Sequence, residues 1–503
     1  MAHPPHDLDR MDRRSFLRRG AAGAALPWLM KLGALGEAAA FNGGAAVSDY
    51  KALVCVFLYG GNDYANTVIT LDTPSYNQYS TIRGGTAGIA IAQSALAATT
   101  LNPLATPQDL LGVNRQYALH PSMTGVANLF NTGKAAVLLN VGPLVKPLTK
   151  AQYQSSNVAL YPRPPQLFSH NDQQSVWQSS SAEGSKVGWG GRIGDRVLGH
   201  SSTVNTQSLF TCMSVTGNAV LLSGDTALQY QVSTSGAIKI QPATNATVYG
   251  SAAVASALNA LVRDTTRTHR LERDHAIVTD RALTAESLVS TALNAPTATG
   301  FTTVFPTSNS LADQLKMVAR LIRGRNELGA KRQVFLVSLG GFDLHDNLIS
   351  QHPGLLDKMS SAMTAFYNAT VEMGVANQVT AFTGSDFGRT LASNGDGSDH
   401  GWGGHHFIVG GAVNGQRFYG TPPPVSVGST SAYADQWHVG QGRLLPTTSV
   451  DQYAATLARW FGVDDSEMAT VVPNIANYPA TGGFDLAWAG GTLNYPRYLG
   501  FLP

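Results

Sequence analysis

The sequence predicts an α/β fold with a central, mostly parallel sheet, and three observations support this prediction. The chain has 503 residues, 43% of them hydrophobic, enough for one large domain with insertions or for two domains. Continuous apolar runs, which are typical of strands buried on both faces of a parallel sheet, recur along the chain. Between two of these runs lies a segment with apolar residues at helical spacing, so strand, helix and strand form one unit.

Four apolar runs are the clearest predicted strands. They are ALVCVFLY (52–59), AAVLLNV (135–141), QVFLVSL (333–339) and QVTAFT (378–383). The predicted helix between the last two runs covers residues 353–374. Its apolar positions are Leu355, Met359, Met363 and Phe366.

Two further helices carry start and stop signals. Ser310 is the predicted cap of one helix. The apolar stripe of that helix consists of Leu311, Leu315, Val318 and Ile322. Near the C-terminus, Ser449 and Gln452 form a capping box, and Gly462 ends the helix that follows.

The middle of the chain, about residues 200–300, is rich in Ser, Thr and Ala and is predicted to be an insertion or cap. Residues 206–224 and 230–240 contain short apolar stretches that favour short strands. Residues 250–293 are predicted to form long helix, since apolar residues recur there without proline.

The first 40 residues are predicted to be a twin-arginine signal peptide, which leaves 41–503 as the folded α/β domain. Arg13 and Arg14 begin the stretch RRSFL, a mildly apolar run follows, and three alanines precede the expected cleavage site. The alternative is a chance basic amphipathic helix. No later segment is apolar enough over enough residues to span a bilayer. The protein is therefore expected in a periplasm or outside the cell, with the twin-arginine translocase as its partner during export.

Charge and cysteine content exclude some functions and leave others open. A formal net charge of +2 with 13% charged residues gives no electrostatic footprint for nucleic acid. Cys55 and Cys212 are the two cysteines and lie in apolar stretches, which favours buried thiols, although one disulfide is an alternative. The sequence contains no P-loop, no H-E-x-x-H and no G-x-S-x-G motif.

Polar side chains follow three of the predicted strands at the point where each strand ends. Asp63, Asp343 and Asp386 each come shortly after small residues that allow a tight turn, and His345 and His400 lie near them in sequence. Ligands of open α/β sheets bind beyond the carboxyl ends of the strands. Carboxylates and imidazoles are ligands for zinc or manganese. We therefore expect one or two divalent ions here; the alternative is solvated turns with carboxylate–imidazole hydrogen bonds.

Six motifs of the chain resemble those of the domain-of-unknown-function family 1501, over nearly all of residues 41–503. The motifs are LYGGNDYANTVI (58–69), LHPSM (119–123), LFSHNDQQSVWQ (167–178), LGGFDLHDN (339–347), TGSDFGRTLASNGDGSDHGWGGHHFIVGGAVNG (383–415) and RLLPTTSVDQYAATLARWFGV (443–463). Members of this family are exported bacterial proteins of the alkaline phosphatase and sulfatase-like superfamily. The resemblance implies an alkaline-phosphatase-like three-layer fold.

The resemblance also implies the chemistry of phosphate and sulfate esters, with two divalent metals and a hydroxyl or modified cysteine nucleophile. Carried over residue by residue, the implied metal ligands are Asp63, Asp343, His345, Asp386 and His400. Phe387 departs from the superfamily pattern, because it stands where a histidine ligand would follow Asp386. A phenyl ring cannot coordinate a metal, so the second metal site depends on His405 or His406 to compensate.

Ser169 is the predicted nucleophile, and Arg389 is predicted to bind two oxygens of a phosphate or sulfate group. Each has a structural alternative: Ser169 as the N-cap of a helix, and Arg389 as the partner of Asp386. Two hypotheses for function follow. One is an exported metal-dependent hydrolase of phosphate- or sulfate-type esters, acting on a small-molecule or polymer ester. The other is a non-catalytic exported protein of the same fold that binds a cell-surface polymer or a protein assembly.

Overall fold

A computed structural model describes residues 47–85, 88–198, 204–295 and 300–503. The predicted signal peptide, residues 1–40, lies outside these ranges. Within them, no helix has both the length and the apolar character needed to cross a membrane.

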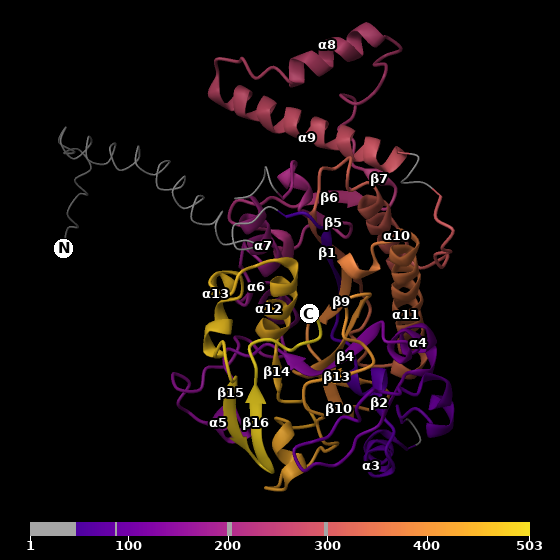
Figure 1. The fold of residues 1–503 in the computed structure, drawn as a ribbon, viewed down its shortest axis with the longest axis vertical. Coiled ribbons are helices and arrows are strands. Elements are labelled where there is room, and N and C mark those ends of the chain that lie inside the picture. Colours follow the sequence, from indigo (N-terminus) through magenta and orange to yellow (C-terminus); the bar gives the residue numbers. More distant parts are fainter. Residues whose placement is uncertain (1–46, 86–87, 199–203, 296–299) are drawn as a thin grey trace, which may run out of the picture.

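The core of the molecule is a ten-stranded sheet with the order β13-β4-β12-β9-β1-β8-β5-β6-β7, and β14 pairs with β4 (Figure 1). The strands are β1 (Lys51–Leu58), β4 (Ala135–Gly142), β5 (Cys212–Ser214), β6 (Tyr230–Ser233), β7 (Gly236–Ala237), β8 (Arg332–Leu339), β9 (Val379–Ser385), β12 (Gly404–Gly410), β13 (Phe418–Tyr419) and β14 (Thr448–Ser449). The central strand β1 pairs in parallel with β8 and β9, whereas β12 is antiparallel to β9 and β4. The prediction of a mostly parallel central sheet is confirmed.

Helices cover both faces of this sheet, which gives three layers (Figure 1). On β1, Val54 and Val56 belong to the apolar core of one face, and Cys55 and Phe57 to that of the other. Because successive strand residues point to opposite faces, a strand buried on both sides must be apolar throughout. The first core packs under α4 (Thr124–Asn131), α10 (Ser310–Arg323) and α11 (Leu348–Glu372), and the second under α6 (His170–Ser179), α7 (Trp189–Leu198), α12 (Val450–Phe461) and α13 (Met468–Val471).

The predicted strands and the capping box of α12 are confirmed, but two helix starts differ from the prediction. The side chain of Asn309, not Ser310, caps α10 by accepting from the backbone N–H groups of Leu311 and Ala312. Helix α11 begins at Leu348 and includes Pro353, instead of starting there. Buried Leu348 donates its N–H to the carbonyl of Asp396 at 3.0 Å, and this tertiary contact extends the helix backwards.

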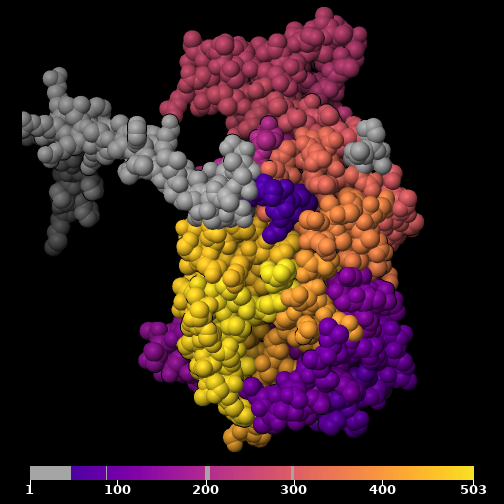
Figure 2. Space-filling model, in the orientation of Figure 1, coloured from indigo at the N-terminus to yellow at the C-terminus, as the bar shows by residue number. Residues whose placement is uncertain are grey.

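The long helix predicted for 250–293 is two helices, α8 (Ala252–Val262) and α9 (Arg270–Asn294). The chain turns at Asp264, whose carboxylate accepts from the N–H of Thr266 at 3.0 Å and so competes with helix hydrogen bonds. Arg263 and Asp280 join the two helices in an ion pair of 2.9 Å. The pair projects beyond the edge strands β6 and β7 as a separate ledge (Figure 2).

The two cysteines are buried free thiols, as predicted. Burial raises the pKa of both thiols, that of Cys212 to about 12. Each therefore stays protonated and unreactive.

Candidate metal centre

The carboxyl ends of β1, β8 and β9 form the floor of the candidate site. Gly60, just after β1, has φ +114°, and a Cβ there would lie 2.4 Å from the backbone nitrogen of Asp343 after β8. The two turns therefore pack against each other with glycine as the one residue that fits. Asp386 follows β9 directly, and His400 ends the short strand β11 (Ser398–His400), which pairs with β10 (Arg389–Ser393).

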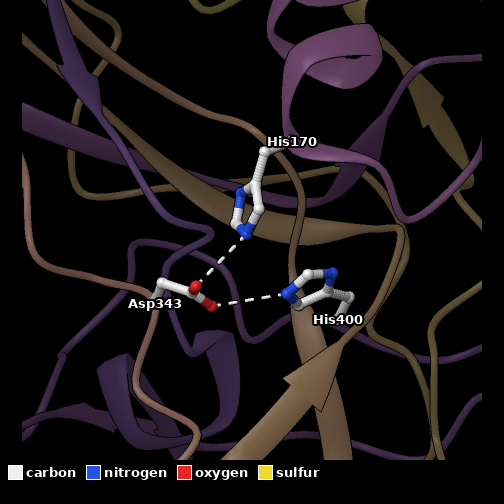
Figure 3. A group of neighbouring side chains, drawn as sticks. All are labelled: His170, Asp343 and His400. Atoms are coloured by element: carbon white, nitrogen blue, oxygen red, sulfur yellow. Dashed lines mark ion pairs between the residues drawn. The ribbon is translucent and has the colours of Figure 1, made fainter.

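Three side chains meet above this floor: His170, Asp343 and His400. Each offers a ligand atom, and these atoms lie within 4.8 Å of one another. The Nε2 atoms of His170 and His400 lie 3.4 and 3.3 Å from the two carboxylate oxygens of Asp343. Both imidazoles point toward that carboxylate (Figure 3). The Nε2 atom of His345 lies 3.1 Å from the same carboxylate and 2.9 Å from Nε2 of His400.

The opposite nitrogen of each imidazole contacts an oxygen. Nδ1 of His170 lies 2.7 Å from Asp386 Oδ2, and Nδ1 of His345 lies 3.3 Å from Asp399. Nδ1 of His400 lies 2.7 Å from the carbonyl of Phe168. Because a carbonyl only accepts, this Nδ1 carries the proton, and the Nε2 of neutral His400 presents a lone pair. Such oxygen partners are typical of the outer contacts that orient metal-binding histidines.

The Nε2 lone pair of neutral His400 and the carboxylate of Asp343 repel each other unless a positive charge lies between them. The Nε2 atom of His170 is buried and has no hydrogen-bond partner among the described residues. An orphaned nitrogen, two further imidazoles and a carboxylate suit a zinc- or manganese-type ion. The residues present therefore fit a metal ion.

The charges around the cluster shift its pKa values in different directions. The hydrogen bond to Asp386 raises the pKa of His170, although burial opposes this. Burial lowers the pKa of His400, which favours the neutral, metal-binding form. Burial acts to raise the pKa of Asp343, but the hydrogen bond and charge of Arg389 outweigh it, so the pKa is lowered. Asp343 is therefore ionised at neutral pH.

Arg389, predicted to bind substrate oxygens, is fully buried and donates to protein groups. Its Nη1 donates to Asp343 at 2.8 Å and to the carbonyl of Gly60 at 2.9 Å. Its Nε and Nη2 donate to the carbonyl of Ser398. The structural alternative for Arg389 fits these contacts better, but its carboxylate partner is Asp343 and not Asp386.

Asp63 does not join the cluster, although it was predicted as a metal ligand. Its carboxylate caps α2 (Tyr64–Thr67) and forms an ion pair with buried Arg83 at 2.8 Å. Ser398 also donates its hydroxyl to Asp63 at 2.6 Å. Burial acts to raise the pKa of Asp63, but Arg83 outweighs it and lowers this pKa to about 2. Both oxygens are therefore committed to structural partners.

Asp386 lies behind His170 and is fully buried. Besides His170, its Oδ2 accepts from Gln174 Nε2 at 2.9 Å and from the N–H of Gly60 at 3.1 Å. The structure thus places Asp386 where it orients His170, one side chain away from the cluster.

Phe387 packs its buried ring against both neighbouring imidazoles, 4.9 Å from His170 and 4.7 Å from His400 between ring centres. His405 and His406, the histidines that were to compensate, are buried in β12. Nδ1 of His405 accepts from the N–H of Asn140, and Nδ1 of His406 contacts the hydroxyl of Thr383. Neither reaches the cluster, so neither replaces the imidazole that Phe387 lacks.

Ser169 stands at the N-cap position of α6, directly before His170. Its hydroxyl makes no capping hydrogen bond to the helix backbone and instead donates to Asp172 at 2.9 Å. The structure therefore pairs the predicted nucleophile with a carboxylate.

His170 is the cluster residue that the sequence did not predict as a ligand. It is the first residue of α6, and Gln174 stands one turn later on the same face. Both side chains reach Asp386. A histidine and a glutamine at this spacing, after the strand-end aspartates had been found, were the available sequence signal.

Three solved structures show what the chain is similar to. The sulfatase PsFucS1 from Pseudoalteromonas sp. is 10% identical, with 86% of this chain and 71% of that chain covered and a TM-score of 0.32. A protein from the glycosaminoglycan-metabolism locus of Bacteroides thetaiotaomicron is 9% identical (83% and 74% covered, TM-score 0.30). The lipoteichoic acid synthase LtaP from Listeria monocytogenes is 11% identical (78% and 73% covered, TM-score 0.28).

No curated protein matches the chain. One family model, described as "Protein of unknown function (DUF1501)", matches residues 50–475. The match takes in the strand-end turns and every member of the histidine–carboxylate cluster. The chain belongs to the DUF1501 family.

Proposed function

We propose that this protein is a metal-dependent hydrolase of phosphate- or sulfate-type esters. The observation that carries the proposal is the convergence of His170, His345 and His400 on the carboxylate of Asp343. An oxygen contacts the far nitrogen of each imidazole, so each ring is held with its Nε2 toward one point.

His170, Asp343 and His400 would hold the metal, and His345 stands next to them as a further ligand. A divalent ion bound there supplies positive charge that stabilises the negative oxygens of a reacting ester. The chain's own groups prepare the site: Arg389 fixes the Asp343 carboxylate, and Asp386 fixes the ring of His170. The cluster is also open to solvent, since the side chain of Asp343 is 44% exposed.

Ser169 is the proposed nucleophile, with Asp172 as the group that accepts its proton. The hydroxyl lies 2.9 Å from that carboxylate, within the range for proton transfer. Ser169 directly precedes His170 in the chain, so its backbone lies next to that member of the cluster. Activity in the Ser169→Ala variant at the wild-type level would show that water attacks the ester directly.

The second candidate function is that of a binding protein, which holds a single metal ion and does not hydrolyse esters. Arg83 forms an ion pair with the carboxylate of Asp63 after β1, and the ring of Phe387 fills the space beside His170 and His400. The described residues therefore contain one metal-binding group. Such a protein would use the fold to bind a cell-surface polymer or a protein assembly.

We also propose that the protein works in a periplasm or outside the cell after twin-arginine export. The pattern of residues 1–40 supports this. In an export assay, the variant in which Arg13 and Arg14 are both changed to Lys should remain in the cytoplasm.

The test of the site is the metal content of protein exported in its native host, measured by elemental analysis. We expect at least one transition-metal ion per wild-type chain and loss of it in His170→Ala, Asp343→Ala and His400→Ala. The matched control is His269→Ala, at the exposed start of α9, which should keep the metal. Metal content unchanged in all three cluster variants, with the fold intact by circular dichroism, would contradict the site.

Metal-loaded protein is then assayed with p-nitrophenyl phosphate and p-nitrophenyl sulfate. Turnover of either ester that is lost when the metal is removed supports the hydrolase. One ion with no turnover of these or of polymeric esters favours the binding protein.

A further inference from the structure

Arg443 lies beside the cluster, on the loop that precedes α12. Its Nε donates to the carbonyl oxygen of His400 at 2.7 Å. Its guanidinium carbon lies 5.3 Å from the centre of the Phe168 ring. Phe168 in turn accepts the hydrogen bond from Nδ1 of His400. The arginine is thus fixed by the same two residues that position one of the cluster histidines.

Two other arginines near the strand ends point their donors at protein acceptors. Arg83 and Arg389 are fully buried and donate hydrogen bonds to carboxylates and carbonyls. Arg443 is half-buried, and no described residue accepts a hydrogen bond from its two Nη groups, although its charge acts on the nearby carboxylate of Asp399. It therefore combines a fixed position, solvent access and a free pair of donors.

A guanidinium edge with free N–H groups matches two oxygens of one tetrahedral anion. The Phe168 ring below it restricts the plane of the guanidinium, and a fixed plane lowers the entropy lost on binding. An uncharged ester or a carboxylic ester would leave these donors without a charged partner. The geometry selects for an ester that carries a phosphate or sulfate group with free oxygens.

We propose that Arg443, and not Arg389, binds the free oxygens of the phosphate or sulfate group of the substrate. This inference rests on the proposed function and adds its specificity-determining residue. It has a direct consequence for binding, because the inorganic anions carry the same oxygens and should occupy the same place.

The test is isothermal titration calorimetry of the metal-loaded protein with inorganic phosphate and with inorganic sulfate. In Arg443→Gln we expect affinity for the anion to fall at least about tenfold, since charged hydrogen bonds are lost. Arg443→Lys restores charge but not the fork and should recover part of the affinity. The matched control is Arg459→Gln, because Arg459 is 55% exposed and also stacks on an aromatic ring, that of Tyr498 at 4.3 Å. The control should bind like wild type.

Metal content and circular dichroism are measured for every variant, so that a disturbed cluster is recognised. Equal anion affinity in wild type and Arg443→Gln, at equal metal content, would overturn the inference, and so would a metal-loaded wild type that binds neither anion. If Arg443-dependent binding occurs without turnover of any ester, the anion site stands and the hydrolase does not. If esters are turned over, KM should rise in Arg443→Gln more than kcat falls; an unchanged KM would overturn the inference and leave the hydrolase standing.

Discussion

Asp63 and Asp343 lie in nearly the same local sequence but in opposite environments. They follow the neighbouring parallel strands β1 and β8, which end level at Leu58 and Leu339, in the stretches GGND and GGFD. The carboxylate of Asp63 is 1% exposed and paired with Arg83, whereas that of Asp343 is 44% exposed and surrounded by imidazoles. The turn after each strand places a carboxylate at the edge of the sheet. The side chain that packs against this carboxylate, Arg83 or the imidazoles, determines whether it is a buried structural group or part of the open cluster.

The partners come from different layers of the fold. Arg83 is the last residue of α3 (Thr73–Arg83), and its whole side chain is buried. His170 comes from α6 and His400 from β11. The two carboxylate sites meet at Ser398, whose hydroxyl donates to Asp63 while its carbonyl accepts from Arg389. The buried Asp63–Arg83 ion pair thus lies directly beneath the partly exposed cluster that is the candidate metal centre.

The largest expected effect on stability is at Asp63, the buried carboxylate of the pair. Arg83→Met leaves the Asp63 carboxylate buried without its counterion, which should cost about 3–5 kcal/mol in the free energy of unfolding. Urea unfolding measures this, with Arg459→Met as the control at an exposed arginine. Metal content per folded chain should stay at the wild-type value. A parallel loss of metal would erase the distinction between the two carboxylates.

An intermediate effect concerns pH. The pKa of Asp63 is about 2 in the folded protein and 3.8 in its unperturbed form, so ionised Asp63 stabilises the fold above about pH 4. This contribution, ~2 kcal/mol, is lost as the pH falls from 4 toward 2, since the unfolded chain binds the proton first. The difference in unfolding free energy between wild type and Asp63→Asn should shrink over this range.

The smallest effect on stability should come from the open side. Asp343→Asn should lower the free energy of unfolding by less than Arg83→Met does, about 1–2 kcal/mol, since the Asp343 carboxylate is partly exposed although its partner Arg389 is buried. Arg389 keeps the carbonyls of Gly60 and Ser398 as acceptors. The same variant should lose its metal. A loss of stability as large as that of Arg83→Met would mean that Asp343 is a structural carboxylate as well.

The fold was predictable because the information for it is local. Strand β1 is apolar from Ala52 to Leu58, and Ser449 with Gln452 caps α12 as their spacing predicts. Local patterns failed where a tertiary contact decides, as at the start of α11. The residue before a predicted cap can also be the better acceptor, and Asn309 is the example.

The site was predictable only in part, because its members meet through the fold. Asp343, His345 and His400 come together as expected of polar residues beyond strand ends. His170 was missed, since nothing in its own segment shows that α6 begins above β8 and β9. Asp63 matched the same pattern as Asp343, and only the position of Arg83, 20 residues later in the chain, sets it apart.

The cluster draws on residues 170, 343, 345 and 400, so the order of synthesis governs when it can exist. A growing chain has the strand β1 and its turn early, but it lacks His400 until β9 has already been made. The last histidine arrives just before β12, the antiparallel strand that joins β9 to β4 and links the two halves of the sheet. Capture of the proposed ion would thus be a late event, coupled to closure of the sheet, because a ribosome-bound fragment that ends before residue 400 lacks one of the proposed ligands.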